Sequence, residues 1–370
     1  TKIHQTIGTC RFIYNFYISH NKEIYEKEKR FISGMSFSKW LNNEYISTNL
    51  DKAWIKNTSS KATKQAIMNS EKAFKKFFNG KSKFPRFKKK KDQEVKAYFP
   101  KNNKTDWTIE RHRVKIPTLG WVRLKEFGYV PINAEVKSGT VSQKADRYYV
   151  SILVEEDSPQ NNDCYSCGIG IDLGIKEFAV CSNGLVKQNI NKTQRVKKLE
   201  KRLKRAQRKL SRKYESLEIR NKNKKGEATR QNIQKQIIKV QKLHKKLTNI
   251  RTDYINKTIN EVVKQKPSFI AIEDLNVSGM MKNRHLSKAV RDQKFYEFRE
   301  KLTKKCHALG IELRIVDRFY PSSKMCNKCG AINKDLKLKD RIYQCSCGYI
   351  ADRDYNASIN LRDAKIYKTA

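Results

Sequence analysis

Residues 321–362 read PSSKMCNKCGAINKDLKLKDRIYQCSCGYIADRDYNASINLR and contain two closely spaced cysteine pairs. Cys326 and Cys329 form a CxxCG motif, and Cys345 and Cys347 follow after fifteen intervening residues. Four thiolates at this spacing predict a tetrahedral zinc site. The second pair has one residue between its cysteines instead of two, so it cannot repeat the geometry of the first. A disulfide or unused thiols are the alternatives, and the reducing cytosol expected for a Lys-rich chain without a visible signal peptide disfavours them.

The residues after the second pair, ADRDYNASINL (351–361), predict a short loop that runs into a helix. Asp354 falls in the first turn of this helix. An acid at that position is ordinarily an N-terminal cap or a partner of the helix dipole. The interpretation of Asp354 therefore depends on acids elsewhere in the chain.

The chain carries a large excess of positive charge. Among 370 residues, 81 Lys and Arg stand against 37 Asp and Glu, which gives a formal charge of +44 at pH 7. Nucleic acid is the expected partner, because neutralising phosphates releases counterions and converts charge into affinity. An anionic membrane is the alternative, but no apolar run approaches about 18 residues and no lipidation signal is present, so we expect no membrane partner. The chain begins at Thr1 inside a helical pattern, and we expect its natural start to be missing.

The beginning of the chain has a helical period. Residues 7–80 predict a bundle of about three helices, of which the third ends at Asn79-Gly80. Ser59 or Ser60 is the expected cap of this third helix. Its apolar face is expected to contain Ala62, Ala66, Ile67, Ala73, Phe74, Phe77 and Phe78.

A strand period follows. The basic residues 81–92 first predict a linker or a loop that grips a nucleic-acid backbone. Alternating apolar residues then predict a small antiparallel barrel or sheet up to about residue 156, with a turn at Ser138-Gly139. The run SPQNND (158–163) predicts a domain boundary.

Residues 167–174, CGIGIDLG, predict a strand whose isoleucines share one face while Asp172 points from the other. A second strand, 178–181, ends before Asn183-Gly184, which is a signal for a type I′ hairpin. An acid in a buried sheet is costly unless it is paired or binds a metal. Asp172 is therefore a candidate site residue.

Residues 192–263 predict a long helical hairpin, because apolar residues recur at intervals of three and four on both arms. The segment KNKKGEATR (222–230) is expected to form its turn. Between Arg195 and Lys213, eleven of nineteen residues are Lys or Arg, more than a solvated exterior requires. We therefore expect nucleic-acid contact rather than plain solvation. The candidate contact residues are Lys197, Lys201, Arg202, Arg205 and Lys209.

Residues 268–275 predict a further strand that ends with Glu273, and a helix (286–309) and a strand (312–316) follow. This order of elements fits an RNase H-like α/β fold, which could bring Asp172, Glu273 and Asp354 together. Such carboxylates can hold two divalent cations about 3.5–4 Å apart for phosphodiester cleavage. Oxygen ligands select Mg²⁺ or Mn²⁺. Three acids in this order beside a thiolate loop favour a nuclease over capping or salt-bridge roles.

Four segments, GIDLG, IAIEDLNVSGM, PSSKMCNKCG and CGYIADRDYNASINL, resemble the RuvC and zinc-ribbon segments of TnpB, the transposon-encoded RNA-guided nucleases related to type V CRISPR effectors. The resemblance extends over nearly all of the chain, including GTCRFIYNFYI near its start and FPRFKKK before the predicted strands. It implies that Asp172, Glu273 and Asp354 are the catalytic triad. Asp354 is preferred to Asp352 because it occupies the D-x-N-A position. The implied zinc ligands are Cys326, Cys329, Cys345 and Cys347.

The resemblance also implies partners and domains. The implied partners are a guide RNA from the transposon end and double-stranded target DNA next to a short motif, and base pairing would read the target sequence. The implied fold is multidomain α+β: a helical recognition domain (1–80), a linker and wedge-like β-barrel (81–160), an RNase H-like RuvC core (161–320) with the basic hairpin inserted (192–263), a zinc ribbon (321–350) and the end of the RuvC-like domain (351–370). The family has a barrel strand before the first helix, which this sequence lacks. The expected location is the prokaryotic cytoplasm, in association with the nucleoid.

Other functions compete with this one. A transposase, or a DNA-binding protein associated with transposition, gives no reason for a cysteine loop before the last acid, and the His-x-His motif of single-strand transposases is absent. An RNA-guided DNA-binding regulator without cleavage should have lost an acid, and a basic RNA-binding scaffold needs none. The sequence therefore favours an RNA-guided DNA endonuclease that acts at one RuvC site.

Overall fold

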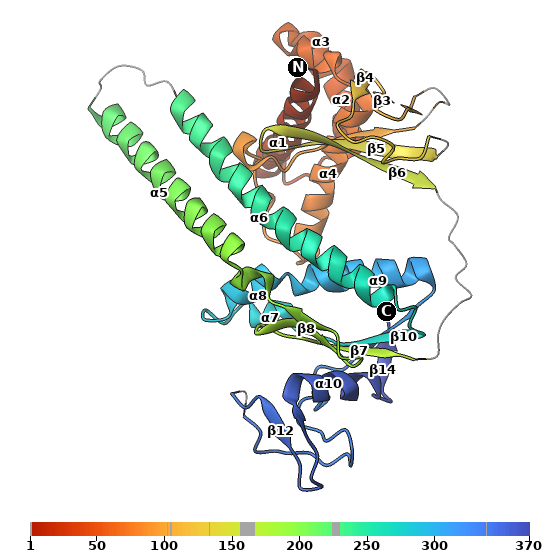
Figure 1. Ribbon diagram of the computed structural model, residues 1–370. Coiled ribbons are helices and arrows are strands. Elements are labelled where there is room, and N and C mark those ends of the chain that lie inside the picture. Colours follow the sequence, from red (N-terminus) through yellow and green to blue (C-terminus); the bar gives the residue numbers. More distant parts are fainter. Residues whose placement is uncertain are drawn as a thin grey trace. The chain divides into compact units, whose positions relative to one another are not determined.

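The structure is a computed structural model that describes residues 2–101, 103, 106–132, 134–155, 167–223, 230–337 and 339–370. The chain divides into two compact units, Thr1–Asp157 and Ser158–Ala370 (Figure 1). The run 158–163, expected to be a boundary, lies outside the described residues. So does most of the expected hairpin turn, residues 224–229.

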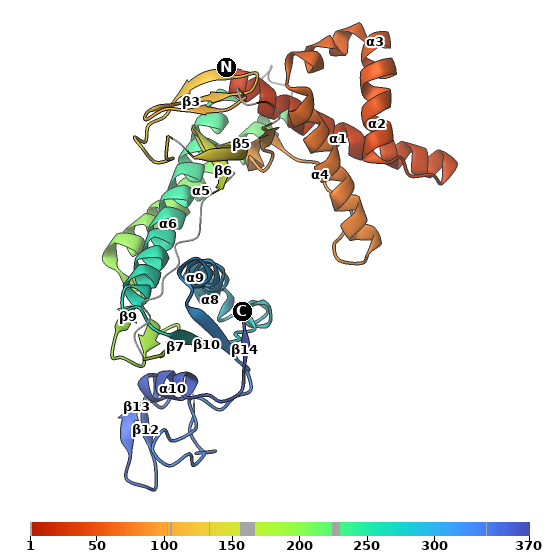
Figure 2. The ribbon, with the colours of Figure 1, turned by 90° about the vertical axis from the view of Figure 1, so that its right-hand side faces the viewer.

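Helices packed through aromatic rings form the first part of unit one. They are α1 (Lys2–Glu28), α2 (Gly34–Trp40), α3 (Ile46–Thr48) and α4 (Ser60–Phe78), with a π-turn at Leu41–Tyr45 and 3₁₀ turns at Leu50–Asn57 and Lys90–Asp92. Helices α1 and α4 lie against each other (Figure 2). Between them the rings of Tyr17 and Phe74 meet edge-on, with their centroids 6.1 Å apart. Phe78, predicted to lie on the apolar face, is 55% exposed, and its ring stacks on Phe74 and meets Phe31 edge-on at the rim of this cluster.

Two antiparallel three-stranded sheets complete unit one. One has the order β1-β5-β6 (Ala97–Pro100, Glu135–Lys144, Arg147–Glu155) and the other β2-β3-β4 (Thr108–Ile109, Arg113–Ile116, Gly120–Arg123). The turn predicted at Ser138-Gly139 is wrong, since both residues lie inside β5. Glycine is required there because Trp107 covers it, and a Cβ on Gly139 would come 2.1 Å from the indole ring. The chain turns instead at Ala145, where φ is +56° and the Gln93 side chain bonds both the N–H and the C=O.

Unit two is built on a six-stranded sheet of order β14-β11-β10-β7-β8-β9. The strands are β7 (Ile169–Leu173), β8 (Glu177–Cys181), β9 (Val186–Gln188), β10 (Phe269–Glu273), β11 (Glu312–Val316) and β14 (Tyr367–Thr369). Strands β7, β10 and β11 are parallel, and the other three run antiparallel to their neighbours. The predictions of β7, β8, β10 and β11 are confirmed, whereas β14 is too short to show a period in the sequence.

The β8–β9 hairpin turns at Asn183-Gly184 as predicted, but not as a type I′ turn. Only Gly184 has a positive φ, +86°, and type I′ requires one at both central residues. Gly184 N–H donates to Cys181 O at 3.0 Å, and Cys181 N–H donates to Leu185 O at 2.9 Å. The loop is therefore longer than a two-residue turn and closes through a left-handed glycine.

Different helices cover the two faces of this sheet (Figure 1). Isoleucines of β7 and β10 face α6 (Gln231–Val263) and α9 (Phe295–Leu309) in the main core of the unit. Ala271 and Val316 face the other side, where α10 (Arg353–Arg362) contributes Leu361. Gly170 also lies on this side, and a Cβ there would come 1.9 Å from the backbone O of Ser358 in α10. The backbones of β7 and α10 thus meet directly.

Helix α5 (Gln194–Lys222) lies beside α6 as the predicted hairpin, preceded by a 3₁₀ turn at Ile190–Lys192 (Figure 1). The predicted apolar stripes are buried between the two helices. The single helix predicted over 286–309 is wrong. It is divided into α8 (Ser287–Gln293) and α9 by Lys294, whose φ is +58°. A short helix α7 (Val277–Met280) follows β10.

The cysteine segment contains a hairpin that the sequence did not predict. Strands β12 (Ile342–Gln344) and β13 (Ile350–Asp352) are antiparallel, with Ile342 opposite Asp352. Strand β13 leads directly into α10, so the second cysteine pair is joined to that helix without a free loop. Among the described residues, no helix has the length and apolar character that a membrane span requires.

Candidate carboxylate and metal sites

Asp172 and Glu273 lie at the carboxyl ends of adjacent parallel strands. Ile171 of β7 is opposite Ile272 of β10, so the next residue on each strand is one of the two acids. Paired strands run about 4.8 Å apart. Both acids lie on the α10 face of the sheet, because each is two residues from a small residue that contacts this helix.

Helix α10 brings Asp354 to the same end of the sheet. Gly170 of β7 contacts Ser358 of α10. Asp172 lies two residues further along β7, about 7 Å from Gly170. Asp354 lies four residues before Ser358, about 6 Å along the helix. The charges of both Asp354 and Glu273 act on Asp172. The structure thus brings the three predicted acids together.

Burial disfavours the ionisation of Asp172 and of Glu273. Burial, with the neighbouring carboxylates of Asp354 and Glu273, raises the pKa of Asp172 to about 7. Burial likewise raises the pKa of Glu273. A divalent cation bound between these carboxylates would offset their repulsion and favour their ionised form, and carboxylate oxygens are ligands that such cations prefer.

Two arginines hold the Asp354 side chain, which is 16% exposed. Arg353 Nη2 lies 3.1 Å from Asp354 Oδ1, and Arg341 Nη1 lies 3.5 Å from Asp354 Oδ2. Asp352, the acid set aside at the sequence level, caps α10. Its Oδ1 accepts from the N–H groups of Asp354 and Tyr355 at 2.9 and 3.0 Å. The two acids therefore differ in role, since Asp352 supports the helix end.

Asp274 is not a further member of this group of acids. Its two carboxylate oxygens accept from Arg299 at 2.5 Å and from Arg318 at 2.6 Å. The hydrogen bonds from Arg318 and Arg299 lower the pKa of Asp274 from its ordinary value. This acid is neutralised by the protein itself, whereas Glu273 beside it is not.

The four predicted cysteines form one cluster. Their Sγ atoms all lie within 4.8 Å of one another, and the pairs Cys326–Cys347 and Cys329–Cys345 are 3.6 and 3.5 Å apart. A zinc ion with bonds of about 2.3 Å to four thiolates needs sulfur atoms about 3.8 Å apart. The two close pairs are slightly nearer than this and no pair is more than 4.8 Å apart, so small adjustments would fit the cluster to such an ion. A hydrogen bond from the Cys347 backbone, with bonds from the other thiols, lowers the pKa of Cys345 to about 6. The cluster can hold a metal ion.

Each cysteine turn is closed by a glycine N–H, but the first closing hydrogen bond spans four residues and the second spans three. In the first, Gly330 N–H donates to Cys326 O at 2.9 Å, and in the second Gly348 N–H donates to Cys345 O at 3.0 Å. Both glycines have a positive φ, +75° and +81°. The shorter pair therefore does not copy the first turn, as predicted, yet it still directs both thiols into the cluster.

Two buried asparagines of α10 hold the cysteine loop. Asn356 Nδ2 donates to Met325 O at 2.7 Å, and Asn360 Nδ2 donates to Ser322 O and Met325 O at 2.7 Å each. Neither asparagine was predicted from the sequence. Their spacing of four places the amides on one helix face, and that could have served as a signal.

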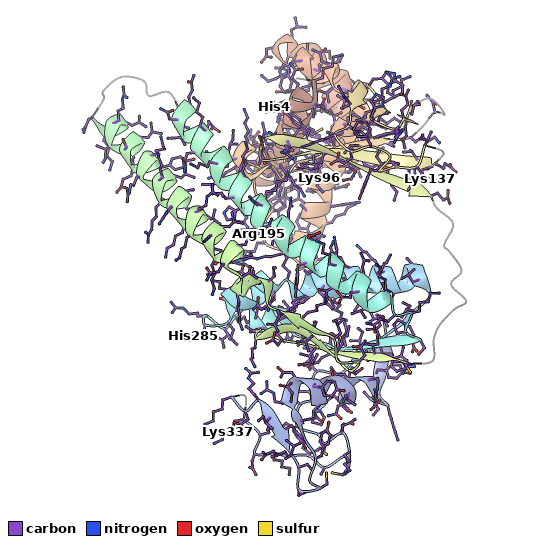
Figure 3. All side chains as sticks on the ribbon, viewed as in Figure 1. His4, Lys96, Lys137, Arg195, His285 and Lys337 are labelled. Carbon is purple, nitrogen blue, oxygen red and sulfur yellow. The ribbon has the colours of Figure 1, made fainter. Side chains whose placement is uncertain are left out.

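The five candidate contact residues on α5 are exposed, and four of them line two cavities along the helix. A cavity of about 1070 Å³ is lined in part by Lys197, Lys201 and Lys288, and one of about 750 Å³ by Arg205 and Lys209. No Phe, Tyr or Trp ring is among the residues that line either cavity, and His244 is the one imidazole among them. In Figure 3, Arg195 marks the start of α5, and side chains that end in nitrogen follow along it. This surface has the chemistry to contact phosphates rather than stacked bases.

Three family models match the chain. The model described as "Helix-turn-helix domain" (HTH_OrfB_IS605) matches residues 1–30, and "Probable transposase" (OrfB_IS605) matches residues 151–284. The model described as "Cas12f1-like, TNB domain" matches residues 295–361. This last match includes the four clustered cysteines and Asp354.

Two relatives match most of the chain. An Escherichia coli (strain K12) protein named "Putative RNA-guided DNA endonuclease InsQ" is 32% identical over 332 residues, which are 86% of this chain and 77% of its own. A Streptomyces pristinaespiralis protein named "Putative RNA-guided DNA endonuclease" is 31% identical over 379 residues, 100% of this chain and 87% of its own. The cryo-EM structure of a Cas12f1-sgRNA-target DNA complex has a chain that is similar with a TM-score of 0.56 and 17% identity, over 100% of this chain and 83% of that one. At this identity the likeness shows a shared mixed helix and sheet fold.

Proposed function

The chain belongs to the TnpB family of transposon-encoded RNA-guided DNA endonucleases, and on this premise we propose that it cuts DNA that matches a bound guide RNA. The observation that carries the proposal is that Asp172, Glu273 and Asp354 gather at one end of the sheet in unit two. Its catalytic residues would be these three acids. Its partners would be a guide RNA from the transposon end and double-stranded target DNA.

The order of the central sheet supports an RNase H-like RuvC core. An antiparallel β9-β8-β7 meander is extended by the parallel strands β10 and β11, with acids on β7, β10 and α10. The proposed domains are recognition helices (1–80), a linker and wedge-like strands (81–160), the RuvC-like core (161–320 and 351–370) with its basic hairpin (192–263), and a zinc ribbon (321–350).

The chain would contribute geometry and charge to the reaction. Two divalent cations, Mg²⁺ or Mn²⁺, when bound, supply an activated water and neutralise the leaving oxygen. Asp172 and Glu273 would hold them from rigid strands, and Asp354 from the first turn of α10. Arg341 and Arg353 orient the Asp354 carboxylate beforehand. Positions fixed in this way before substrate arrives lower the reorganisation that cleavage requires.

Zinc is the proposed ion of the cysteine cluster. Four thiolates in tetrahedral spacing favour zinc over Mg²⁺, which prefers oxygen ligands. The two asparagines that hold the loop to α10 link this cluster to the helix that carries Asp354. The zinc ribbon would therefore stabilise one end of the carboxylate site.

The basic surface of α5 is the proposed site of nucleic-acid contact. Lys197, Lys201, Arg202, Arg205 and Lys209 are all exposed on it. Lysine and arginine bind phosphates and thereby recognise backbone shape, while base pairing with the guide reads the target sequence.

The test is cutting of guide-matched DNA by the full chain loaded with its RNA in Mg²⁺. Asp172→Ala, Glu273→Ala and Asp354→Ala should each abolish cutting and leave RNA-guided DNA binding intact, because phosphate contacts come from Lys and Arg. Asp352→Ala is the matched control, and it should lose about 1 kcal/mol of stability as a helix cap while it still cuts.

Two results would contradict the proposal in different ways. Robust Mg²⁺-dependent cutting by Asp354→Ala would remove this acid from the site. A folded wild-type chain that binds guide-matched DNA but never cuts it would instead indicate an RNA-guided regulator.

A further inference from the structure

A polar network at the base of the α5–α6 hairpin takes no part in the chemistry described so far. Arg251 of α6 lies at its centre, with a side chain that is 13% exposed. Its guanidinium bonds three other segments. Nε donates to Asn191 Oδ1 at 2.7 Å, Nη2 to Glu200 Oε1 at 2.9 Å, and Nη1 lies 3.0 Å from Asp292 Oδ1. Each nitrogen of the planar fork therefore has a partner.

Asn191 continues the network toward the loop between β7 and β8. Its Nδ2 donates to Gln293 Oε1 at 3.3 Å, and Gln293 Nε2 donates to Gly174 O at 3.2 Å and Ile175 O at 3.4 Å. A second branch runs through Asn189, whose Oδ1 accepts from Asn191 N–H at 2.9 Å and whose Nδ2 donates to Ile175 O at 2.7 Å. Two side-chain amides thus hold the carbonyls of this loop, and Asn191 orients both amides.

The loop held in this way immediately follows a proposed catalytic acid. Gly174 is two residues after Asp172, and its N–H donates to Phe178 O across the β7–β8 turn at 3.3 Å. A movement of this loop would therefore move the Asp172 carboxylate. Displacement of a catalytic group by about 1 Å can reduce a rate by about a hundredfold.

Stability alone does not explain a polar network at this place. Asp292, Gln293 and Asn189 are all buried, and burying an ion pair contributes little net stability relative to apolar residues of similar volume. Arg251 also lies beside an apolar stripe of α6, next to Leu247, Ile250 and Tyr254. What a fully bonded network supplies is a fixed geometry.

We propose that Arg251 is a positioning residue for Asp172: its guanidinium fixes Asn191, which in turn orients the amides that hold the loop after this acid. The inference rests on the proposed function, because it concerns the same carboxylate site. It also links Glu200, which lies within the basic run of α5, to the start of that loop.

The experiment uses the full chain with its guide RNA and three variants. Arg251→Met removes the centre of the network, and Gln293→Met removes only the last amide and keeps the ion pairs, so it decides the matter if Arg251→Met does not fold. Glu261→Gln is the control, because it breaks an ion pair between α6 and Lys187 of β9, and among the described residues neither of these two side chains bonds the loop after Asp172.

Three quantities are measured for each variant: amide hydrogen exchange of peptides within residues 169–181, affinity for guide-matched DNA, and the cutting rate as a function of Mg²⁺. In both network variants we expect exchange about tenfold faster. DNA affinity should be unchanged and cutting about a hundredfold slower, with a higher Mg²⁺ concentration for half-maximal rate. The control should match wild type in all three.

Each contrary result has its own meaning. Faster exchange with wild-type cutting and Mg²⁺ dependence would make the network merely structural, and unchanged exchange would show that it does not hold the loop. Either result overturns the inference while wild-type cutting upholds the proposed function. If wild type itself does not cut, the proposed function fails and the inference falls with it.

Discussion

At the scale of single residues, Asp172 is a carboxyl whose burial opposes its ionisation. Its pKa is raised from 3.8 to about 7 in the folded chain, chiefly by burial. Between these two values the folded state binds a proton that the unfolded state has released, so stability falls as the pH rises through this window and is then constant. Each pKa unit is worth about 1.4 kcal/mol, which puts the loss at up to about 4 kcal/mol.

Asp172→Asn should remove this loss. In zinc-loaded protein without Mg²⁺, the free energy of unfolding of the variant should exceed that of wild type by an amount that grows between about pH 4 and pH 7 and then levels off. Denaturant unfolding at a series of pH values measures the difference. A difference independent of pH would show that Asp172 ionises freely in the fold.

The residues proposed to carry the chemistry could be picked out from the sequence, whereas the residues that support them could not. Asp172, Glu273 and Asp354 each stand at the end of a short periodic segment, where an acid is conspicuous. Arg251 lies many residues from Asn191 and Asp292, and an ion pair between such distant positions leaves no period in a sequence. The network around Arg251 therefore required the structure.

At the scale of secondary-structure elements, the contact of β7 with α10 depends on one glycine. A Cβ at position 170 would come 1.9 Å from Ser358 O and 2.6 Å from Arg362 N, both backbone atoms. Gly170→Ala should therefore cost more than about 4 kcal/mol or prevent folding of unit two, because neither backbone can move aside alone.

Gly8→Ala is the matched control for this substitution. Gly8 lies within α1, and the nearest atom to an added Cβ is 4.0 Å away. It should stabilise the chain by up to about 1 kcal/mol, since Ala favours helix more than Gly does. Thermal unfolding measures both variants, and a Gly170→Ala chain as stable as wild type would disprove the close contact.

The cysteine segment should depend on its metal. Strands β12 and β13 are three residues each, and few apolar side chains there are buried besides Tyr343. Because ligand binding at such a site is folding free energy, a chelator that removes zinc should unfold residues 321–350 and leave the six-stranded sheet intact. Limited proteolysis detects the change, and metal analysis should find one zinc per chain. A wild-type zinc content in Cys329→Ala would contradict the assignment.

Helices and strands were predictable where their apolar period extends over many residues. They were uncertain where a single residue determines whether the element ends or turns. The stripes of α5 and α6 recur over many turns, so both helices were found from the sequence. One left-handed residue, Lys294, divides α8 from α9 without disturbing the apolar period. Gly139 was mistaken for a turn residue, because in a sequence a glycine that makes room for Trp107 cannot be told from a glycine that allows a turn.

At the scale of the whole molecule, the formal charge of +44 predicts that nucleic-acid binding depends strongly on salt. Net charge attracts any polyanion, whereas contacts at fixed positions determine how many counterions are released. The two effects can be separated by reversing the same number of charges in two different places.

One variant replaces Lys197, Lys201, Arg202, Arg205 and Lys209 with Glu, and its control replaces five exposed lysines of α1 and α4 with Glu: Lys22, Lys27, Lys61, Lys72 and Lys76. Both have the same net charge, so long-range attraction is lowered equally. If α5 contacts phosphates, the first variant should bind structured RNA more weakly, and the slope of log affinity against log salt should flatten by roughly 0.7–0.9 for each phosphate that the protein no longer neutralises. The control should lose affinity while it keeps more of the slope. Equal slopes in the two variants would mean that the α5 surface is merely solvated and acts only through the total charge.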